Sequence, residues 1–194
     1  MNEQEQAAWE LYVFLTQRGV PHAIIGGLAV RQWGEPRFTQ DVDVTAAFPL
    51  DDPLPLLQEL TAHFPPRLPD AVDFARRHRV LLVRASNGVP LDISLGLPGY
   101  EEGVMTRAVD LELEPGKIVR LCSAEDLIIH KAVAGRPQDL WDIEGVVYRQ
   151  GASLDTATIR RWLRAFAEVL DQPDLPERFE TPWRKMIEFR NRGT

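Results

Sequence analysis

Two aspartates separated by a single residue are the part of this sequence best suited to chemistry. Asp41 and Asp43 stand in the string Asp41-Val42-Asp43-Val44. Side chains alternate between the faces of a strand, so both carboxylates are expected on one face, where they repel each other. A divalent cation would neutralise them, and Mg²⁺ typically takes one or two carboxylates together with substrate phosphates. The pair therefore indicates a metal-dependent phosphoryl or nucleotidyl site, although isolated acidic pairs are also common as solvated surface charge.

A glycine pair upstream favours the phosphate interpretation. Gly26 and Gly27 follow an apolar run, Ala23 to Ile25, and precede a helix-like stretch. A strand that ends in glycine and opens a helix exposes backbone N–H groups at a helix N-terminus, where phosphate binds favourably. We therefore expect Gly26 and Gly27 to cradle the β- and γ-phosphates of a nucleoside triphosphate (NTP).

The whole string, GGLAVRQWGEPRFTQDVDV over residues 26–44, resembles the signature of the nucleotidyltransferase superfamily related to DNA polymerase beta. In detail it is similar to the AbiEii/AbiGii toxin-type branch, whose members include toxins of bacterial toxin–antitoxin and phage-defence systems. The resemblance implies an α+β fold, with a small mixed β-sheet core flanked by helices and a C-terminal helical part. It also implies a third carboxylate on a later strand. Asp92, in the string Val89-Pro90-Leu91-Asp92-Ile93-Ser94, is the match; taken alone, it could equally be a charge at a strand edge.

A second block, SAEDLIIHKAVAGRPQDLWD over residues 123–142, is similar to the family's downstream Lys…Arg-x-x-Asp segment. Ser123 with Asp126 is typical of a helix start. Lys131 falls beside the apolar stripe of that helix, so it either extends to water or contacts the triphosphate and the leaving pyrophosphate. Asp139 and Asp142 could orient Lys131 or an incoming acceptor group, and the resemblance implies such a role for Asp139.

Arg37 and Thr39 belong to the same resemblance. Arg37 precedes Asp41 by four residues, and an arginine fork fits phosphate oxygens, so Arg37 is a candidate phosphate or acceptor contact. The alternative is a surface arginine in a Gly-Glu-Pro loop. Thr39 is assigned with it to nucleotide binding. Many superfamily members have Gly-Ser where this chain has Gly26-Gly27, so no hydroxyl is available there, which leaves the acceptor class open.

The composition limits the remaining possibilities. The chain has 194 residues, 44% apolar and 26% charged, and a net charge of −7. It has no apolar run of the roughly 18 residues that a membrane span needs and no signal-like N-terminus, so we expect a cytoplasmic protein without a membrane partner. A single cysteine excludes an internal disulfide and a cysteine cluster for zinc. The net charge argues against a broad nucleic-acid surface. A basic cluster at residues 76–84 is either a solvated helix end or an RNA contact.

Periodicity and turn residues predict the elements that must position these groups. Helices are expected over 3–18, 27–34, 53–63, 71–77, 123–134, 137–150, 155–170 and 182–190, and strands over 22–26, 41–47, 80–85 and 90–95. The strands over 80–85 and 90–95 are expected to form a hairpin through the turn Ser86-Asn87-Gly88, and a second hairpin is expected over 109–121. We expect a nucleotidyltransferase core over 1–121 and a helical region over 122–194 that packs on it. Trp141, Trp162 and Trp183 are expected to anchor the packing of the helical region.

The function expected from these observations is Mg²⁺-dependent transfer of a nucleoside monophosphate (NMP) from an NTP to a hydroxyl acceptor. Asp41, Asp43 and Asp92 would hold two Mg²⁺ ions, or Mn²⁺, about 3.5–4 Å apart. Asp92 is a candidate to accept the proton of the attacking hydroxyl, while Lys131 and Arg37 neutralise charge. RNA, such as a tRNA 3′ end, is the expected acceptor of a toxin-like enzyme, which could have a cognate antitoxin. The alternatives are a small hydroxylated acceptor such as an antibiotic, a protein side chain, or a catalytically silent nucleotide- or partner-binding module.

Overall fold

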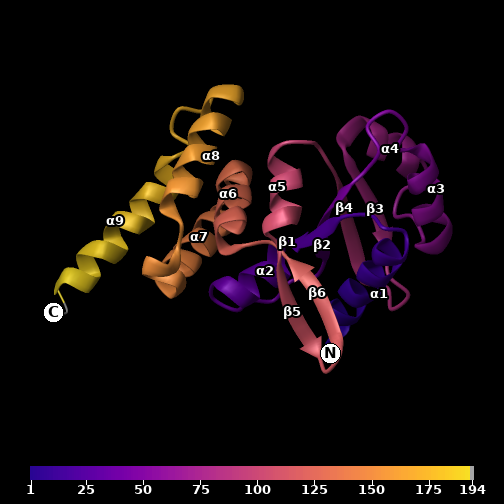
Figure 1. Ribbon diagram of the computed structural model, residues 1–194, viewed down its shortest axis with the longest axis horizontal. Helices are drawn as coiled ribbons and strands as arrows, with labels where there is room; N and C mark the ends of the chain where they lie inside the picture. The colour runs from indigo at the N-terminus through magenta and orange to yellow at the C-terminus, as the bar shows by residue number, and fades with distance from the viewer. Residues whose placement is uncertain (193–194) are drawn as a thin grey trace. The chain divides into compact units, whose positions relative to one another are not determined.

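A six-stranded mixed β-sheet organises the first two thirds of the chain in the computed structural model, which describes residues 1–192. The strands lie in the order β3-β4-β2-β1-β6-β5 (Figure 1). The central strand β2 pairs antiparallel with β1 and parallel with β4, and β1 pairs parallel with β6. Their bounds are β1 His22–Ile25, β2 Val42–Ala47, β3 Val80–Arg84, β4 Pro90–Gly96, β5 Val109–Glu114 and β6 Lys117–Leu121. With helices around this sheet and helices only after β6, the expected α+β class is confirmed.

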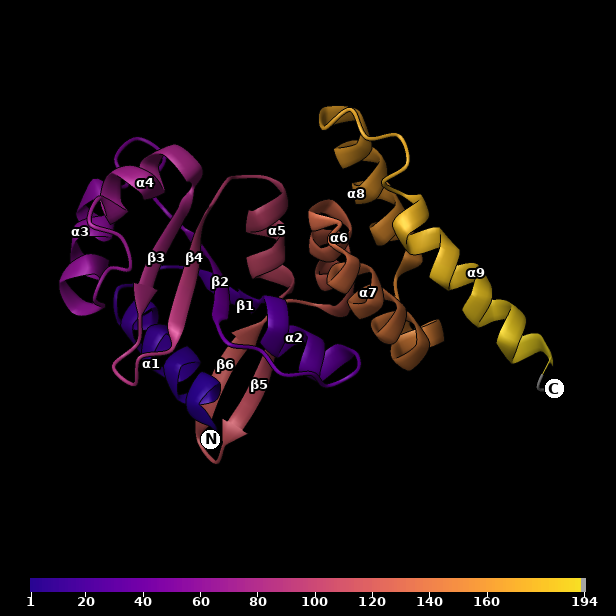
Figure 2. The same cartoon turned by 180° about the vertical axis from the view of Figure 1, so that it is seen from behind.

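The alternation of side chains along β2 separates a core face from a polar face. Val42, Val44 and Ala46 are at most 1% exposed, and helix α1 (Glu3–Gln17) packs against β1, β2 and β6 (Figure 2). Helix α1 begins with a capping box between Asn2 and Glu5 and buries an apolar stripe with a spacing of three to four residues. The opposite face of β2 carries Asp43, Thr45 and Ala47. Because the apolar face of β2 is buried, the Asp43 side chain must point to the opposite face.

The strand that carries Asp92 is an interior strand held by two neighbours. Strands β3 and β4 form the expected hairpin, with Gly88 at φ +85° in its turn, a conformation that glycine adopts without strain. The β4 residues Leu91 and Ile93 are fully buried, and each such side chain stabilises the fold by about 1.5–3 kcal/mol. Because Asp92 lies between them in sequence, its side chain is on the face of the sheet that also carries Asp43.

Among the described residues, four more helices come between the strands in the sequence, and four helices follow the last strand. The first set comprises α2 (Gly26–Trp33), α3 (Leu54–His63), α4 (Ala71–His78) and α5 (Tyr100–Arg107). The second comprises α6 (Ala124–Ala134), α7 (Pro137–Gln150), α8 (Thr156–Val169) and α9 (Glu177–Arg192), with a 3₁₀ turn at Gly151–Ser153. Helix α5 was not expected from the sequence, and α9 begins five residues earlier than expected, with Pro182 inside it. The other elements begin and end within two residues of their expected bounds.

The chain forms two compact units. The first, named the catalytic unit because it carries the aspartates expected to do chemistry, contains Met1–Leu28 and Phe38–Cys122; the second, the helical unit, contains Ala29–Arg37 and the chain from Ser123 onward. The segment Ala29–Arg37 belongs to the helical unit because its backbone accepts hydrogen bonds from α7. Arg149 donates to the carbonyl oxygen of Gly34 at 2.7 Å, and Gln150 donates to that of Trp33 at 2.7 Å. Packing of the helical region on the core stays a prediction.

The helical unit has its own apolar centre. Helix α6 contacts α7 and α8, and α7 contacts α9. Side chains that are at most 1% exposed meet there: Leu127, Ile128, Ile143, Val146, Val147, Ile159, Leu163 and Phe179. The expectation that Trp141 anchors this packing is wrong, since Trp141 is 70% exposed. Ile143, Val146 and Val147 take the inward positions of α7 instead.

Among residues 1–192, no helix has both the length and the apolar character that crossing a membrane requires.

Candidate functional site

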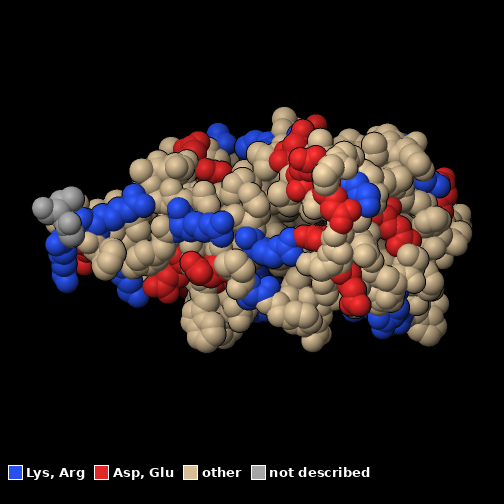
Figure 3. Space-filling view, turned by 90° about the horizontal axis from the view of Figure 1, so that it is seen from below, with Lys and Arg blue, Asp and Glu red and all other residues tan. Residues whose placement is uncertain are grey.

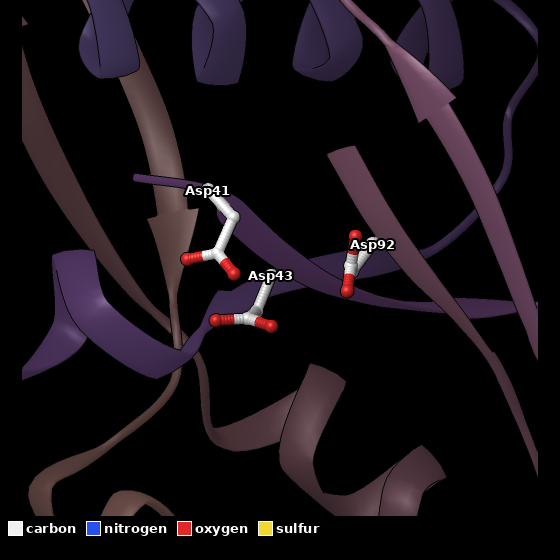
Figure 4. Close-up of side chains that lie close together, drawn as sticks. All are labelled: Asp41, Asp43 and Asp92. Atoms are coloured by element: carbon white, nitrogen blue, oxygen red, sulfur yellow. The ribbon is translucent and has the colours of Figure 1, made fainter. Parts of the chain in front are cut away.

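Three carboxylates converge on one face of the sheet. Asp43 is the register partner of Asp92 in the parallel pairing of β2 with β4, and it lies opposite Ile25 in the pairing of β2 with β1. Asp41 directly precedes β2, two residues from Asp43, and so points to the same side. Oxygen atoms of the three side chains lie within 4.8 Å of one another, and all three are half-buried (Figure 4). We call Asp41, Asp43 and Asp92 the carboxylate triad.

The carboxylate triad suits a hard divalent cation. Its donors are all oxygen atoms, the class that Mg²⁺ and Mn²⁺ prefer. An octahedral ion with bonds of about 2.1 Å has ligand oxygens at most about 4.2 Å apart. Separations of up to 4.8 Å therefore require adjustments of a few tenths of an ångström for one ion, or suit two adjacent ions. The residues present fit the metal requirement that the sequence implied.

Gly26 and Gly27 allow two site side chains to approach the start of α2. Gly26 has φ +65°, and a Cβ atom there would lie 2.6 Å from Cγ of Asp43 and overlap its carboxylate oxygen. At Gly27 a Cβ atom would lie 2.6 Å from Cβ of Thr39. Both separations are shorter than real Cβ contacts, so neither position accepts a side chain without displacing a site residue. The glycine pair therefore makes room for Asp43 and Thr39 and leaves the first backbone N–H groups of α2 uncovered by side chains of its own.

Thr39 orients Asp41. Its hydroxyl lies 3.0 Å from Oδ1 of Asp41 and 3.3 Å from the Asp41 carbonyl oxygen, and it donates to the carboxylate. A donated hydrogen bond stabilises the ionised carboxylate and limits its rotation. A direct contact between Thr39 and a nucleotide, as expected from the sequence, stays a prediction.

Asp92 has a cationic neighbour that the sequence reading missed. Nη1 of Arg67 donates to Oδ1 of Asp92 and forms an ion pair with it. Burial raises the pKa of the Asp92 carboxyl, the Arg67 guanidinium partly offsets this rise, and the negative charge of Asp41 adds to it. Arg67 stands in a proline-rich segment, Pro65-Pro66-Arg67-Leu68-Pro69, whose sequence gives no sign of a site residue. Only the tertiary structure reveals it.

A second group of expected residues forms a buried ion-pair network in the helical unit. Nζ of Lys131 lies 2.9 Å from Oδ1 of Asp139 and 2.9 Å from Oδ2 of Asp142, and all three side chains are at most 7% exposed. Arg37 binds Asp142 with two N–H groups, at 2.8 and 2.9 Å. Arg136 binds Asp139 at 2.7 Å. The structure thus brings Lys131 together with Asp139, as the sequence suggested, and adds Arg37 through Asp142.

The pKa values in this network follow from its contacts. Burial raises the pKa of Asp139, but hydrogen bonds from Arg136 and Lys131 more than offset the effect, so the net pKa is lowered. Burial likewise raises the pKa of Asp142, and hydrogen bonds from Arg37 and Lys131 lower it further than burial raises it. Both carboxylates are therefore ionised at neutral pH, and they compensate the buried charge of Lys131.

The comparison with known families agrees with this geometry. The model of the family described as nucleotidyl transferase AbiEii toxin, type IV toxin–antitoxin system, matches residues 21–192. The chain belongs to the AbiEii family. It is therefore a nucleotidyltransferase, as the resemblance of its motifs indicated. The matched range includes the carboxylate triad, the glycine pair and the Lys131 network.

Solved structures of low sequence identity share the fold of this AbiEii chain. An antigenic nucleotidyltransferase-like protein from Paracoccidioides brasiliensis has a TM-score of 0.53 and 18% identity, with 92% of this chain and 93% of that chain covered. The antibiotic-resistance factor ANT(2″)-Ia has a TM-score of 0.54 and 18% identity, with coverage of 86% and 95%. The lincosamide antibiotic adenylyltransferase LnuA has a TM-score of 0.50 and 12% identity, with coverage of 75% and 96%. No curated protein matches the sequence.

The close approach at Gly26 gives the first testable prediction. Gly26→Ala and Gly116→Ala both place a side chain at a positive φ, so each should lose at least about 1 kcal/mol of unfolding free energy. Only Gly26→Ala should also displace the Asp43 carboxylate and weaken Mn²⁺ binding, because nothing lies within 4 Å of a Cβ atom at Gly116. Urea unfolding and Mn²⁺ titration of both variants measure the two effects. Equal Mn²⁺ affinities would show that Gly26 has no part in positioning Asp43.

The buried network gives a pH-dependent prediction. Lys131→Met should lower the unfolding free energy by about 3–5 kcal/mol at neutral pH, because two buried carboxylates lose a shared cation. The lowered pKa values of Asp139 and Asp142 contribute stability above their unfolded-state pKa, and this contribution is lost as the pH falls through their folded-state values. The difference between wild type and variant should therefore shrink as the pH falls below the unfolded-state pKa of aspartate, about 3.9. Urea unfolding across this pH range measures it.

Lys117→Met is the matched control, because it removes a half-exposed lysine that pairs with Glu114. It should change the unfolding free energy by at most about 0.5 kcal/mol at every pH. A Lys131→Met effect that is small, or that does not vary with pH, would contradict the electrostatic account of the network.

Proposed function

We propose that this chain transfers NMP from an NTP to a hydroxyl group of an RNA acceptor, such as a tRNA 3′ end, in a Mg²⁺-dependent reaction, with Mn²⁺ as a substitute. The observation that carries the proposal is the convergence of Asp41, Asp43 and Asp92 within 4.8 Å beside a helix that opens with two glycines. Carboxylates next to a helix N-terminus suit a metal-bound triphosphate. The family supplies the reaction class.

Each of the site residues in the catalytic unit has a defined role in the proposed reaction. Asp41, Asp43 and Asp92 would hold the divalent ions, which when bound would stabilise the attacking and leaving oxygens of an in-line displacement. Thr39 keeps the Asp41 carboxylate aimed at them. The backbone N–H groups that begin α2 at Gly26 and Gly27 donate to the β- and γ-phosphates. A carboxylate oxygen of Asp92 accepts the proton of the attacking hydroxyl.

Lys131 and Arg37 are proposed to neutralise the triphosphate and the leaving pyrophosphate. A lysine ammonium has three N–H donors, and Lys131 uses two of them on Asp139 and Asp142. One N–H group remains for a phosphate oxygen, and the two carboxylates fix its direction. Asp139 then acts by orienting Lys131, and Arg37 acts through its fork on Asp142.

The distribution of charged residues between the two units supports RNA as the acceptor. The helical unit has 13 Lys and Arg residues against 13 Asp and Glu, whereas the catalytic unit has nine against 16 and carries the whole net charge of −7. Figure 3 shows Lys and Arg side chains in a row along the helical unit. Helix α9 contributes the exposed Arg184, Lys185, Arg190 and Arg192. Such a row suits a phosphate backbone, which supports RNA as the acceptor.

A small cationic acceptor, such as an antibiotic, is the second candidate. The acidic catalytic unit favours it, because a net charge of −7 on that unit attracts a polycation and repels RNA. ANT(2″)-Ia and LnuA, which share the fold, are named for antibiotic resistance and for lincosamide adenylylation. A catalytically silent module would be favoured by an Asp92 distant from Asp41 and Asp43, which is not the arrangement found.

A toxin role, a cytoplasmic location and a cognate antitoxin complete the proposal. They are supported by the description of the family as a type IV toxin–antitoxin toxin. NTPs and tRNA are both available in the cytoplasm, so the proposed reaction needs no other compartment.

The test is a transfer assay with each of the four α-³²P-labelled NTPs, Mg²⁺, and either total tRNA or a panel of aminoglycosides and lincosamides. We expect label on tRNA, and its loss when the tRNA 3′ end is first oxidised with periodate. Asp41→Asn with Asp43→Asn should lower the rate by at least about a thousandfold, because electrostatic stabilisation of the transition state is lost. Asp51→Asn with Asp52→Asn, the same charge change at two exposed positions of the catalytic unit, should leave the rate unchanged.

Label on an antibiotic but not on tRNA would replace the proposed acceptor and keep the reaction. An absence of transfer to any acceptor, with no NTP binding, would contradict the proposed activity.

A further inference from the structure

Arg67 is held at the edge of the sheet by backbone hydrogen bonds. Pro66 forms an isolated antiparallel bridge with Val83 of β3. The Arg67 amide donates to the carbonyl oxygen of Leu82 at 3.0 Å, and the Arg84 amide donates to that of Pro65 at 2.9 Å. Residues 65–67 thus extend the sheet by one short segment beyond β3, and the position of the Arg67 main chain is fixed by the fold.

The register of the strands explains how this side chain reaches the carboxylate triad. Leu82 is the cross-strand partner of Asp92, so the Arg67 side chain passes over Leu82, across the width of β3, to meet Asp92. Two strand spacings amount to about 9.6 Å, which an extended arginine and an aspartate span together. The resulting ion pair joins Nη1 of Arg67 to Oδ1 of Asp92, with side chains 27% and 29% exposed.

The guanidinium therefore occupies one of the two carboxylate oxygens of Asp92 and leaves only the other oxygen to a divalent ion. Asp92 belongs to the triad whose ligand oxygens lie within 4.8 Å of one another, and one of its two oxygens accepts from Arg67. A fixed positive charge beside the site also repels an incoming cation. In the same triad, the Asp41 oxygen accepts a hydrogen bond from a neutral hydroxyl, that of Thr39, which does not oppose metal binding.

We propose that Arg67 is the resident counter-cation of Asp92, and that a divalent ion gains full access to Asp92 only when the guanidinium moves to the phosphates of the incoming NTP. This inference rests on the proposed function. Asp41 and Asp43 take an ion first; Asp92 joins when an anionic substrate draws Arg67 away. An arginine fork suits phosphate oxygens as well as it suits a carboxylate. Arg67 is then a positioning residue that couples NTP binding to the completion of the metal site.

The test measures Mn²⁺ binding to the full chain from the electron paramagnetic resonance signal of free Mn²⁺, with and without an α,β-methylene NTP analogue. Without the analogue, Arg67→Gln should bind Mn²⁺ about tenfold more tightly than wild type, because a competing charge is gone. Arg67→Lys, which keeps the charge, should stay within about threefold of wild type. The analogue should strengthen Mn²⁺ binding by wild type at least about tenfold, and strengthen binding by Arg67→Gln much less.

Arg120→Gln is the matched control, because it removes the same charge from the catalytic unit at an arginine paired with Asp110. It should bind Mn²⁺ like wild type. Equal affinities for Arg67→Gln and Arg120→Gln, or weaker binding by Arg67→Gln, would overturn the counter-cation role while leaving the metal site intact. If wild type and Asp41→Asn with Asp43→Asn bind Mn²⁺ equally poorly even with the analogue, the metal site itself fails, and the proposed function fails with it.

Discussion

Mutual repulsion among three carboxylates is the constraint on which the arrangement of the catalytic unit depends. Two like charges 4.8 Å apart interact unfavourably by roughly 3 kcal/mol at an effective dielectric constant of about 20. The fold nevertheless directs all three to one face, because the opposite face of β2 and β4 is committed to the apolar core. Thr39 and Arg67 partly compensate the charge on Asp41 and Asp92. Divalent cations from solution would compensate the triad further, which suits an enzyme that binds metal with its substrate.

In the helical unit, by contrast, buried charges of opposite sign are paired with one another. Nζ of Lys131 lies 2.9 Å from one oxygen of Asp139 and 2.9 Å from one oxygen of Asp142. Arg37 donates to the other oxygen of Asp142, and Arg136 donates to the other oxygen of Asp139. Both carboxylates have all their partners within the protein, so the network fixes the geometry of Lys131 without a ligand.

Much of the fold follows from local sequence patterns. The period-two alternation at Asp41 to Val44 correctly predicts that both aspartates share a face, and the Ser86-Asn87-Gly88 turn correctly predicts the β3–β4 hairpin that carries Asp92. Helix α5 escaped prediction because Tyr100–Arg107 contains a glycine and has no clear apolar stripe. The α9 boundary was missed because Pro182 reads as a helix break, although here it lies in the second turn of the helix.

The tertiary parts of the site could not be predicted from local patterns. Arg67 reaches Asp92 across an entire strand, and no spacing in the sequence encodes that reach. The glycine pair reads in the sequence as a phosphate cradle, but its close approach to Asp43 and Thr39 depends on the pairing of β1 with β2 and on the path of the chain between them. The exposure of Trp141 depends on which residues of α7 face α6 and α9. Each of these features arises from contacts between elements.

Under the proposed function, Asp41, Asp43 and Asp92 bind divalent metal together once an NTP is present. Crystals of the protein with Mn²⁺ and a non-hydrolysable NTP analogue, measured for anomalous scattering by manganese, test it directly. One or two manganese peaks are expected at about 2.2 Å from oxygens of all three carboxylates and of the triphosphate. A bound triphosphate with manganese away from these carboxylates, or with Asp92 still paired to Arg67 and outside the coordination sphere, would contradict it.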